Sequence, residues 1–230
     1  MKKSLNSFPE KNGRKNKTVL LVALTGGIAS GKSVIATVLQ IKGCTVHSAD
    51  AAAHELMEPL KPAWKKIVAH FGLRVLNPDR TINRAVLGQI VFSLKSERAF
   101  LNNLIHPLIL REKRRIIRRL EKEGQTRIFV SEAALTVEAG FAKFFDRVIV
   151  SSCRTDVQVK RLMERDGISR KEAEKKISSQ MPLKDKLAYA DYVIDTSGTL
   201  AETVEQTERV YAQLMRDYEL KTQKAVSRKT

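Results

Sequence analysis

The sequence is poor in cysteine, in histidine clusters and in long apolar runs, and each shortage excludes a class of protein. Only two cysteines, Cys44 and Cys153, occur among 230 residues, and their flanks show no metal-ligand spacing. We therefore expect reduced thiols in a cytoplasmic protein rather than a disulfide framework or a zinc site. The longest apolar run, near Val19–Leu24, is far too short to span a membrane. The polar, lysine-rich N-terminus also lacks the apolar segment of a secretory signal.

Acidic residues are scarce as well. Asp and Glu number 25 against 42 Lys and Arg, which gives a formal net charge of +17 at pH 7. Such an excess favours anionic partners such as nucleotides, nucleic acid or acidic membrane, without choosing among them. Part of the charge lies in residues 1–17 and 221–230, which we interpret as basic tails, the first of them disordered. With 43% hydrophobic residues, the remainder can form a core.

Between these tails, predicted strands alternate with predicted helices. Continuous β-branched and aliphatic runs predict buried strands at 18–25, 45–49, 127–131, 147–151 and 192–194. Helical periodicity predicts helices at 32–41, 51–57, 64–71, 84–94, 96–124, 155–165, 170–179 and 199–218, with a break or kink at Pro107. The alternation predicts an α/β fold of three layers, α/β/α, with a five-stranded parallel sheet.

Residues Gly26–Ser33 read G-G-I-A-S-G-K-S between a predicted strand and a predicted helix, which indicates a phosphate-binding P-loop rather than a chance Gly-rich turn. Glycines let the backbone turn tightly and aim its N–H groups at phosphate oxygens, and the helix N-terminus adds its positive dipole end. Lys32 can reach the β- and γ-phosphates, and the Ser33 hydroxyl can ligate the Mg²⁺ that bridges them. The residues expected at the phosphates are Gly26, Gly27, Ile28, Ala29, Ser30, Gly31, Lys32, Ser33 and Val34.

Other charged residues each have a functional and a structural interpretation. Asp50 follows the second predicted strand, where it can accept a proton from a substrate hydroxyl, orient Mg²⁺, or cap the next helix. Arg161 and Arg165 share one helix face, where they can neutralise a transferring phosphoryl group or form a solvated, ion-paired surface. The basic segment Arg111–Lys122 is compatible with an RNA-binding stripe or a solvated helix face. We favour the solvated face, because the segment lacks the aromatic residues that stack on bases.

Several shorter motifs accompany these residues. They are L-T-G-G-I-A-S-G-K-S at 24–33, S-A-D at 48–50, H-F-G at 70–72, D-R-T-I-N-R at 79–84, I-H-P at 105–107, Gln158 with Arg161, Gln180, and A-D-Y-V-I-D at 190–195. Together they resemble the dephospho-CoA kinase family from about Leu21 to Tyr211. Their order and spacing are far more specific than the P-loop alone.

The resemblance implies a single P-loop kinase domain at 18–220, with its core at 18–50, 125–153 and 190–220. A helical insertion at 51–124 would bind the CoA-like substrate, and a lid at 154–180 would close over the phosphates. The implied activity is ATP- and Mg²⁺-dependent phosphorylation of the ribose 3′-hydroxyl of dephospho-CoA, the last step of coenzyme A synthesis.

The resemblance also implies roles for residues. Asp50 would be the catalytic base, assisted by Lys32 and Arg161, and Arg165 would be a second, weaker clamp on ATP. Ser33 would ligate Mg²⁺. The residues implied at the dephospho-CoA site are Asp50, His54, Arg84, His106 and Glu132.

The sequence departs from the family pattern mainly on the acceptor side. Ser48 replaces the first acid of D-A-D, His54 replaces an arginine, and 132–138 reads E-A-A-L-T-V-E in place of D-x-P-L-L-x-E. A kinase of another nucleoside or nucleotide is therefore one alternative. A basic nucleic-acid-binding P-loop protein is another, and it predicts RNA affinity that falls steeply with salt. We expect neither a membrane partner nor an obligate nucleic acid.

Overall fold

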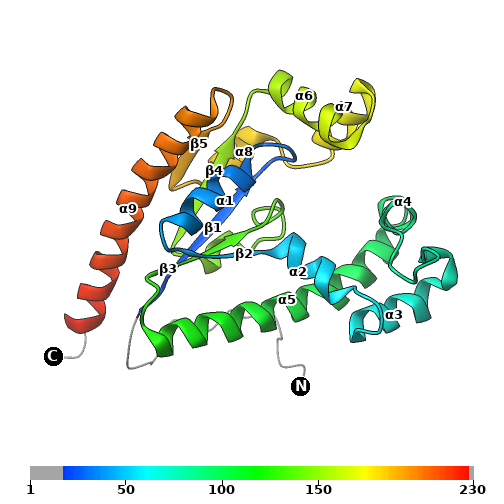
Figure 1. Ribbon diagram of the computed structural model, residues 1–230, viewed down its shortest axis with the longest axis horizontal. Helices are drawn as coiled ribbons and strands as arrows, with labels where there is room; N and C mark the ends of the chain where they lie inside the picture. The colour runs from blue at the N-terminus through cyan, green and yellow to red at the C-terminus, as the bar shows by residue number, and fades with distance from the viewer. Residues whose placement is uncertain (1–17, 228–230) are drawn as a thin grey trace. The chain divides into compact units, whose positions relative to one another are not determined.

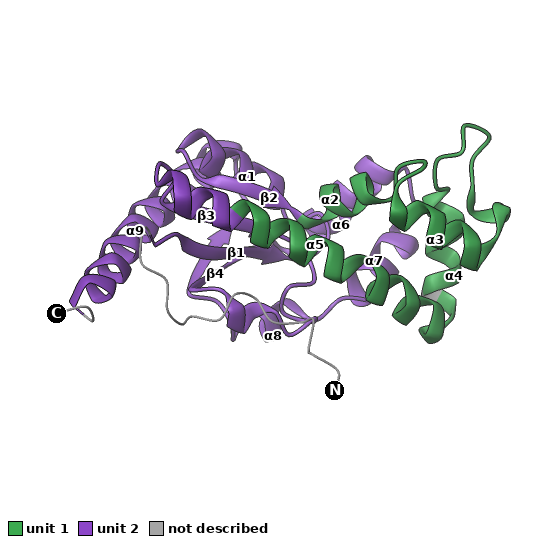
Figure 2. Cartoon of the chain, turned by 90° about the horizontal axis from the view of Figure 1, so that it is seen from below, with its two compact units in different colours: residues 1–13, 49–116 green, residues 14–48, 117–230 purple. Residues whose placement is uncertain are grey.

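The computed structural model describes residues 18–227, with the side chain of Phe92 excepted, and the tail expected at 1–17 lies outside this range. The described chain forms two compact units, drawn in different colours in Figure 2. The smaller unit comprises residues 49–116, and the larger comprises 18–48 with 117–227. Within the described chain, no helix is both long enough and apolar enough to cross a membrane.

The larger unit is built on a parallel five-stranded sheet (Figure 1). Its strands are β1 (Leu20–Gly26), β2 (Thr45–Ser48), β3 (Ile128–Glu132), β4 (Arg147–Ser152) and β5 (Tyr192–Asp195). The order is β2-β3-β1-β4-β5, and every neighbouring pair is parallel, so all five carboxyl ends lie at one edge. The five predicted strands are confirmed, with small shifts at their ends.

Helices and loops cover both faces of this sheet, as the three-layer prediction requires. On one face, α1 (Lys32–Ile41) and α9 (Leu200–Ser227) pack on alternate residues of β1. The buried residues of that contact include Leu20, Val22, Leu24, Ile35, Leu39, Val210 and Leu214. On the other face, the hydroxyl of Thr25 and the ammonium of Lys186 in α8 (Leu183–Leu187) both donate to the Ala134 carbonyl, at 3.1 and 2.9 Å.

The C-terminal helix is longer than expected. It was predicted to end at residue 218, with a solvated tail from 221, but α9 continues to Ser227, and the tail assignment is wrong for 221–227. Contacts with distant residues explain the extension. The Lys221 ammonium pairs with Asp146 and donates to the Val19 carbonyl at 2.9 Å. The guanidinium carbon of Arg127 lies 5.9 Å from the centre of the Tyr218 ring.

The segment predicted to be a lid, 154–180, contains α6 (Thr155–Asp166) and α7 (Arg170–Ser178). A short 3-10 helix, η2 (Ala142–Phe144), precedes β4. Ser169 caps α7 with a reciprocal pair of bonds to Glu172, the arrangement that satisfies free N–H groups at a helix start. The core between the two lid helices contains Val159, Leu162 and Ala173.

The regular elements of the smaller unit are helices, and one isolated antiparallel bridge joins Leu76 to Ile82. The unit contains α2 (Ala49–Leu56), α3 (Pro62–Phe71), η1 (Leu73–Val75), α4 (Arg84–Ser93) and α5 (Lys95–Glu123), whose last turns after residue 116 belong to the larger unit. His70 of the H-F-G motif contacts α5 in this unit. The His70 ring stacks on Phe100 at 3.7 Å, and its Nε2 lies 2.6 Å from Glu97, which joins α3 to α5.

Of the break or kink predicted at Pro107, the break does not occur, because α5 runs through this residue as one helix. Proline removes one intrahelical hydrogen bond and normally ends or bends a helix. Ile105 and Ile109, on either side of it, are buried in a cluster with Ala52 and Ala63 of α2 and α3. This packing stabilises the helix across the missing bond.

Candidate active site

The P-loop joins β1 to α1 as predicted, and its lysine lies over the loop backbone. Lys32 is the first residue of α1. Its ammonium donates to the carbonyl of Gly27 at 2.8 Å and to that of Gly26 at 3.2 Å. Two loop carbonyls therefore hold the Lys32 ammonium at the N-terminus of a helix. A cation beside a helix N-terminus is the arrangement that binds phosphate oxygens.

Two of the motif glycines are required by space and by backbone conformation. A Cβ at Gly26 (φ 152°) would lie 2.1 Å from the Ser151 hydroxyl. A Cβ at Gly31 (φ 75°) would lie 3.0 Å from the side chain of Thr196. Both φ values are in the region that favours glycine. The tight turn therefore depends on residues from β4 and from the end of β5.

Ser151 and Thr196 support the loop from behind, and sequence reasoning missed both. The hydroxyls of Ser30 and Ser151 are 2.5 Å apart, and both residues are buried. The Thr196 hydroxyl lies 3.0 Å from the Ser30 carbonyl. The sequence signal for both residues is their position in the chain. Ser151 lies at the carboxyl end of β4 and Thr196 directly follows β5, and these two strands lie on the same side of β1 in the sheet.

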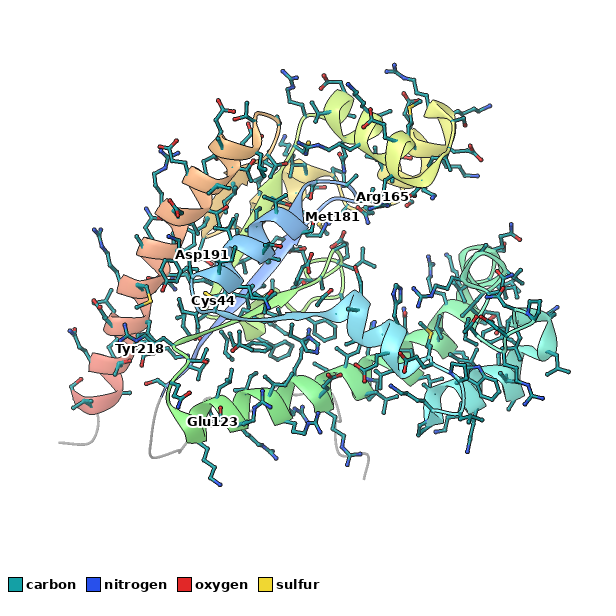
Figure 3. All side chains as sticks on the ribbon, viewed as in Figure 1. Cys44, Glu123, Arg165, Met181, Asp191 and Tyr218 are labelled. Atoms are coloured by element: carbon teal, nitrogen blue, oxygen red, sulfur yellow. The ribbon has the colours of Figure 1, made fainter. Side chains whose placement is uncertain are left out.

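The structure gives the two candidate lid arginines different hydrogen-bond partners. Arg161 donates to the Thr196 carbonyl at 2.7 Å and to its hydroxyl at 3.2 Å, so a single residue links its guanidinium to the P-loop. Arg165, labelled in Figure 3, instead donates to Asp166 at 2.8 Å, and more than half of its side chain is exposed. Arg165 therefore matches the solvated, ion-paired interpretation that the sequence left open.

Glu132 is the last residue of β3, paired with Leu24 of β1 and Ser48 of β2. It lies at the same sheet edge as the P-loop. The segment that follows it is anchored by Lys186, which is completely buried and lies 2.7 Å from Glu138. Sequence reasoning missed Lys186, because L-K-D-K reads as an ordinary solvated helix.

A polar hollow of about 440 Å³ lies at the end of β5 and the start of α9. Its lining residues are Arg154, Asp195, Ser197, Gly198, Glu202, Glu205, Gln206 and Arg209. Thr196, which supports the P-loop, belongs to the same turn as Asp195 and Ser197. The hollow is therefore connected to the phosphate loop through one short segment.

Asp50 lies in the smaller unit, in the first turn of α2. The helix begins at Ala49, one residue before it, so the interpretation of Asp50 as the N-cap residue is wrong. Its side chain is exposed. Only Ala49 separates it from the end of β2, and a carboxylate in a first helical turn is favoured by the helix dipole.

The candidate acceptor residues His54, Arg84 and His106 also lie in the smaller unit, together with Lys113, which sequence reasoning missed. Burial and the nearby Arg84 guanidinium lower the pKa of His54, against a smaller opposing effect of Asp50. Burial and the Lys113 ammonium lower the pKa of His106. Both imidazoles are therefore neutral at pH 7.

Lys113 contradicts the interpretation of 111–122 as a wholly solvated face, because it is only 6% exposed. It continues a buried stripe of α5 at four-residue spacing, after Ile105 and Ile109. Burial lowers the pKa of its ammonium to about 8, although Asp50 and Glu112 act in the opposite direction. A lysine interrupting an apolar stripe was the available sequence signal.

Replacing Lys113 by Met should stabilise the protein at pH 7 by about 2 kcal/mol, because a buried ammonium is replaced by an apolar group. In the folded wild type this lysine loses its proton near pH 8, against 10.5 for the ordinary side chain. Between pH 8 and 10.5 the unfolded state binds more protons than the folded state. The contribution of Lys113 to the free energy of unfolding therefore rises with pH and is lost as the pH falls through 8.

The Cys44 thiol has the opposite effect, because burial raises its pKa from 9.0 to about 12, and its contribution to stability declines above pH 9. In urea unfolding at pH 7, 8, 9 and 10, the free energy of unfolding of the wild type should therefore rise with pH. The Lys113→Met protein should lack this rise. Lys122→Met, at an exposed position of the same helix, serves as the control. Parallel pH curves for wild type and Lys113→Met would contradict the assignment.

Within residues 18–227, no group of three or more His, Cys, Asp and Glu side chains could hold a metal ion. Mg²⁺ does not need such a cage, since it commonly uses one or two protein oxygens together with substrate phosphates and water. The exposed Ser33, next to Lys32 in the first turn of α1, fits that donor set.

A parallel sheet in this order, a P-loop after its central strand and an arginine-bearing helix pair after β4 define a P-loop kinase. The family model described as dephospho-CoA kinase matches residues 20–202. The chain belongs to the dephospho-CoA kinase family.

Known proteins agree with this assignment. A dephospho-CoA kinase of Geobacter metallireducens is 42% identical over 188 residues, covering 82% of this chain and 93% of the relative. The solved structure of TT1252 from Thermus thermophilus is similar with a TM-score of 0.71 and 27% identity, covering 86% of this chain and 99% of that one. A dephospho-CoA kinase structure from Campylobacter jejuni has a TM-score of 0.62 and 29% identity, with 86% and 98% covered.

Proposed function

We propose that this protein transfers the γ-phosphoryl group of ATP to the ribose 3′-hydroxyl of dephospho-CoA, giving coenzyme A and ADP. The observation that carries the proposal is the extent of the family match. It runs from β1 to the start of α9, and so includes the P-loop, the helical unit and the lid in one continuous stretch.

On the donor side, the P-loop N–H groups and Lys32 bind the β- and γ-phosphates. Ser33 supplies a hydroxyl ligand to Mg²⁺, which neutralises phosphate charge when bound. Arg161 turns from Thr196 toward the transferring group as the lid closes. The polar hollow beside β5 receives the adenosine, with Arg154 available to stack on the base.

On the acceptor side, Asp50 accepts the proton of the ribose 3′-hydroxyl as that oxygen forms its bond to the γ-phosphorus. The bond from the γ-phosphorus to the bridging oxygen breaks, and ADP leaves. Neutral His54 and His106 provide hydrogen bonds, while Arg84 attracts the anionic groups of the substrate. Glu132, at the end of β3, lies at the sheet edge where such a substrate binds.

A second acceptor is favoured by one specific observation. One family acid and one arginine at the acceptor side are replaced, by Ser48 and His54, and residues 133–134 read Ala-Ala. A nucleoside or nucleotide kinase that uses the same donor site therefore remains the alternative function.

The decisive experiment couples ADP release to a spectroscopic signal and compares dephospho-CoA with adenosine and AMP, each with ATP and Mg²⁺. We expect turnover with dephospho-CoA and little or none with the other two. Formation of coenzyme A is then verified by mass. A folded sample that binds ATP but transfers no phosphate to dephospho-CoA would exclude the proposed function.

We also propose that the protein works in the cytoplasm. Cys44 and Cys153 are both buried and free, which suits a reducing compartment. A fluorescent fusion found only in an oxidising compartment or at a membrane would contradict this assignment.

A further inference from the structure

One residue of the P-loop, Ile28, is held at both of its backbone groups by glutamines from the lid region. The Gln158 amide, in α6, donates from Nε2 to the Ile28 carbonyl at 2.5 Å. The Gln180 amide, between α7 and α8, accepts at Oε1 from the Ile28 N–H at 2.7 Å. A backbone carbonyl can only accept and an N–H can only donate, so the chemistry of Ile28 fixes both amide orientations.

These bonds act on two adjacent peptide planes. In a trans peptide, the carbonyl of one residue and the N–H of the next lie in one plane and point in opposite directions, and the described chain has no cis peptide. The bond from Gln158 to the Ile28 carbonyl therefore turns the N–H of Ala29 away from the lid helix. In a P-loop, N–H groups at this part of the turn are phosphate donors.

The other plane joins Gly27 to Ile28. Gln180 holds its N–H, and its carbonyl, on the opposite side, accepts from the Lys32 ammonium at 2.8 Å. The same carbonyl accepts from the Ser30 N–H at 3.2 Å. Gln180 therefore acts, through one rigid plane, on the position of the lysine that binds phosphate.

The contact between loop and lid is partly buried. Gln158 is only 8% exposed. Ile28 and Ala29 pack on a cluster formed by Val159, Leu162 and Ala173 of the two lid helices. Ala29 has φ 55°, a conformation uncommon for residues other than glycine, so the backbone here needs support from its surroundings. A Cβ at Gly27 would lie 2.5 Å from Nε2 of Gln158, which shows how closely the amide approaches the loop.

We propose that Gln158 and Gln180 are positioning residues of the ATP site, which set the directions of the Ala29 N–H and the Gly27 carbonyl. They tie the phosphate-binding form of the P-loop to both ends of the lid. The inference rests on the proposed function only in requiring that the loop binds ATP.

The two glutamines have opposite hydrogen-bond roles, which gives a matched test. In Gln158→Glu the donor becomes an acceptor facing a carbonyl, so the bond is lost. In Gln180→Glu an acceptor remains, so the bond survives. Both changes add one negative charge at nearly unchanged volume. Replacement by Met removes either bond without adding charge, and Gln40→Glu, at an exposed position on α1, controls for charge alone.

We expect Gln158→Glu and Gln158→Met each to lower kcat/KM for ATP by about 10- to 100-fold, the cost of a partly buried carbonyl left without its donor. Gln180→Met should show a similar loss, and Gln180→Glu should retain several-fold more activity than Gln180→Met. KM for dephospho-CoA should change little in all four. A purely structural role would instead lower the thermal midpoint and the active fraction, without changing KM for ATP.

Binding of a non-hydrolysable ATP analogue, followed by calorimetry, repeats the comparison without any acceptor. If the wild type binds the analogue but does not phosphorylate dephospho-CoA, the proposed function fails, while the same order of affinities among variants would still support the inference. A Gln158→Glu enzyme within twofold of wild type in both assays would overturn the inference. Equal impairment of Gln180→Glu and Gln180→Met would also overturn it.

Discussion

An Asp50→Asn enzyme should bind both substrates and turn over about 10²- to 10⁴-fold more slowly, the range that a general base contributes. The amide keeps the size of the carboxylate but cannot accept the proton of the ribose hydroxyl. Because Asp50 is exposed in the first turn of α2, the fold should be preserved, with a loss of no more than about 1 kcal/mol from the helix dipole. Single-turnover kinetics measure the phosphoryl-transfer step directly.

Glu55→Gln, the same change five residues later on α2, is the matched control. Glu55 is exposed and pairs with Lys61, so its replacement should leave kcat within twofold of wild type. An Asp50→Asn enzyme with more than a tenth of wild-type kcat would disprove the role of Asp50 as base. The proton would then have to leave to solvent or to another group of the acceptor site.

Replacing Lys32 by Met should lower kcat/KM for ATP by about 10²- to 10³-fold, the usual loss when one fixed donor to developing charge is removed. Its ammonium bonds two loop carbonyls, those of Gly26 and Gly27, at the N-terminus of α1. Methionine preserves the length of the side chain but supplies neither charge nor donors. Lys32→Arg should also be strongly impaired, because a planar, wider guanidinium does not replace a compact ammonium within a tight loop.

Lys42→Met, at the other end of α1, provides the control for Lys32. Lys42 pairs with Glu208 at a partly exposed position, and loss of the pair should cost no more than about 1 kcal/mol. Activity should be unchanged. ATP affinity measured by calorimetry separates a lost phosphate contact from misfolding. Near-wild-type affinity and turnover in Lys32→Met would mean that the loop holds phosphate through its backbone alone.

The P-loop was predictable from sequence because its chemistry is local. Eight consecutive residues supply the turn, the cation and the helix start, and flanking periodicity identified the strand and the helix. The five strands were predictable for a related reason, since continuous apolar runs mark strands buried on both faces. None of these features depends on which distant segment happens to pack against them.

The contacts that hold the site together could not be predicted, because they join residues far apart in the chain. Thr196 supports Ser30, and Gln180 holds Ile28, across more than a hundred residues, and no local pattern encodes either pair. The buried lysines were missed for a different reason. Lys113 and Lys186 lie in charged segments, where composition indicates solvation and only the tertiary packing reveals burial.

The central position of β1 has a consequence for synthesis of the protein on the ribosome. This strand carries the P-loop, and within residues 18–227 it pairs with β3 and β4. The next strand along the chain, β2, pairs with β3 and not with β1. A nascent chain must extend beyond Ser152 before both edges are covered, which takes on the order of 10 s at ordinary translation rates. During that interval an apolar strand has unpaired edges, a hazard for aggregation. Stalled chains that end before Ser152 should therefore recruit holdase chaperones, and ATP can stabilise this enzyme only after the last support of the loop, Thr196, has emerged.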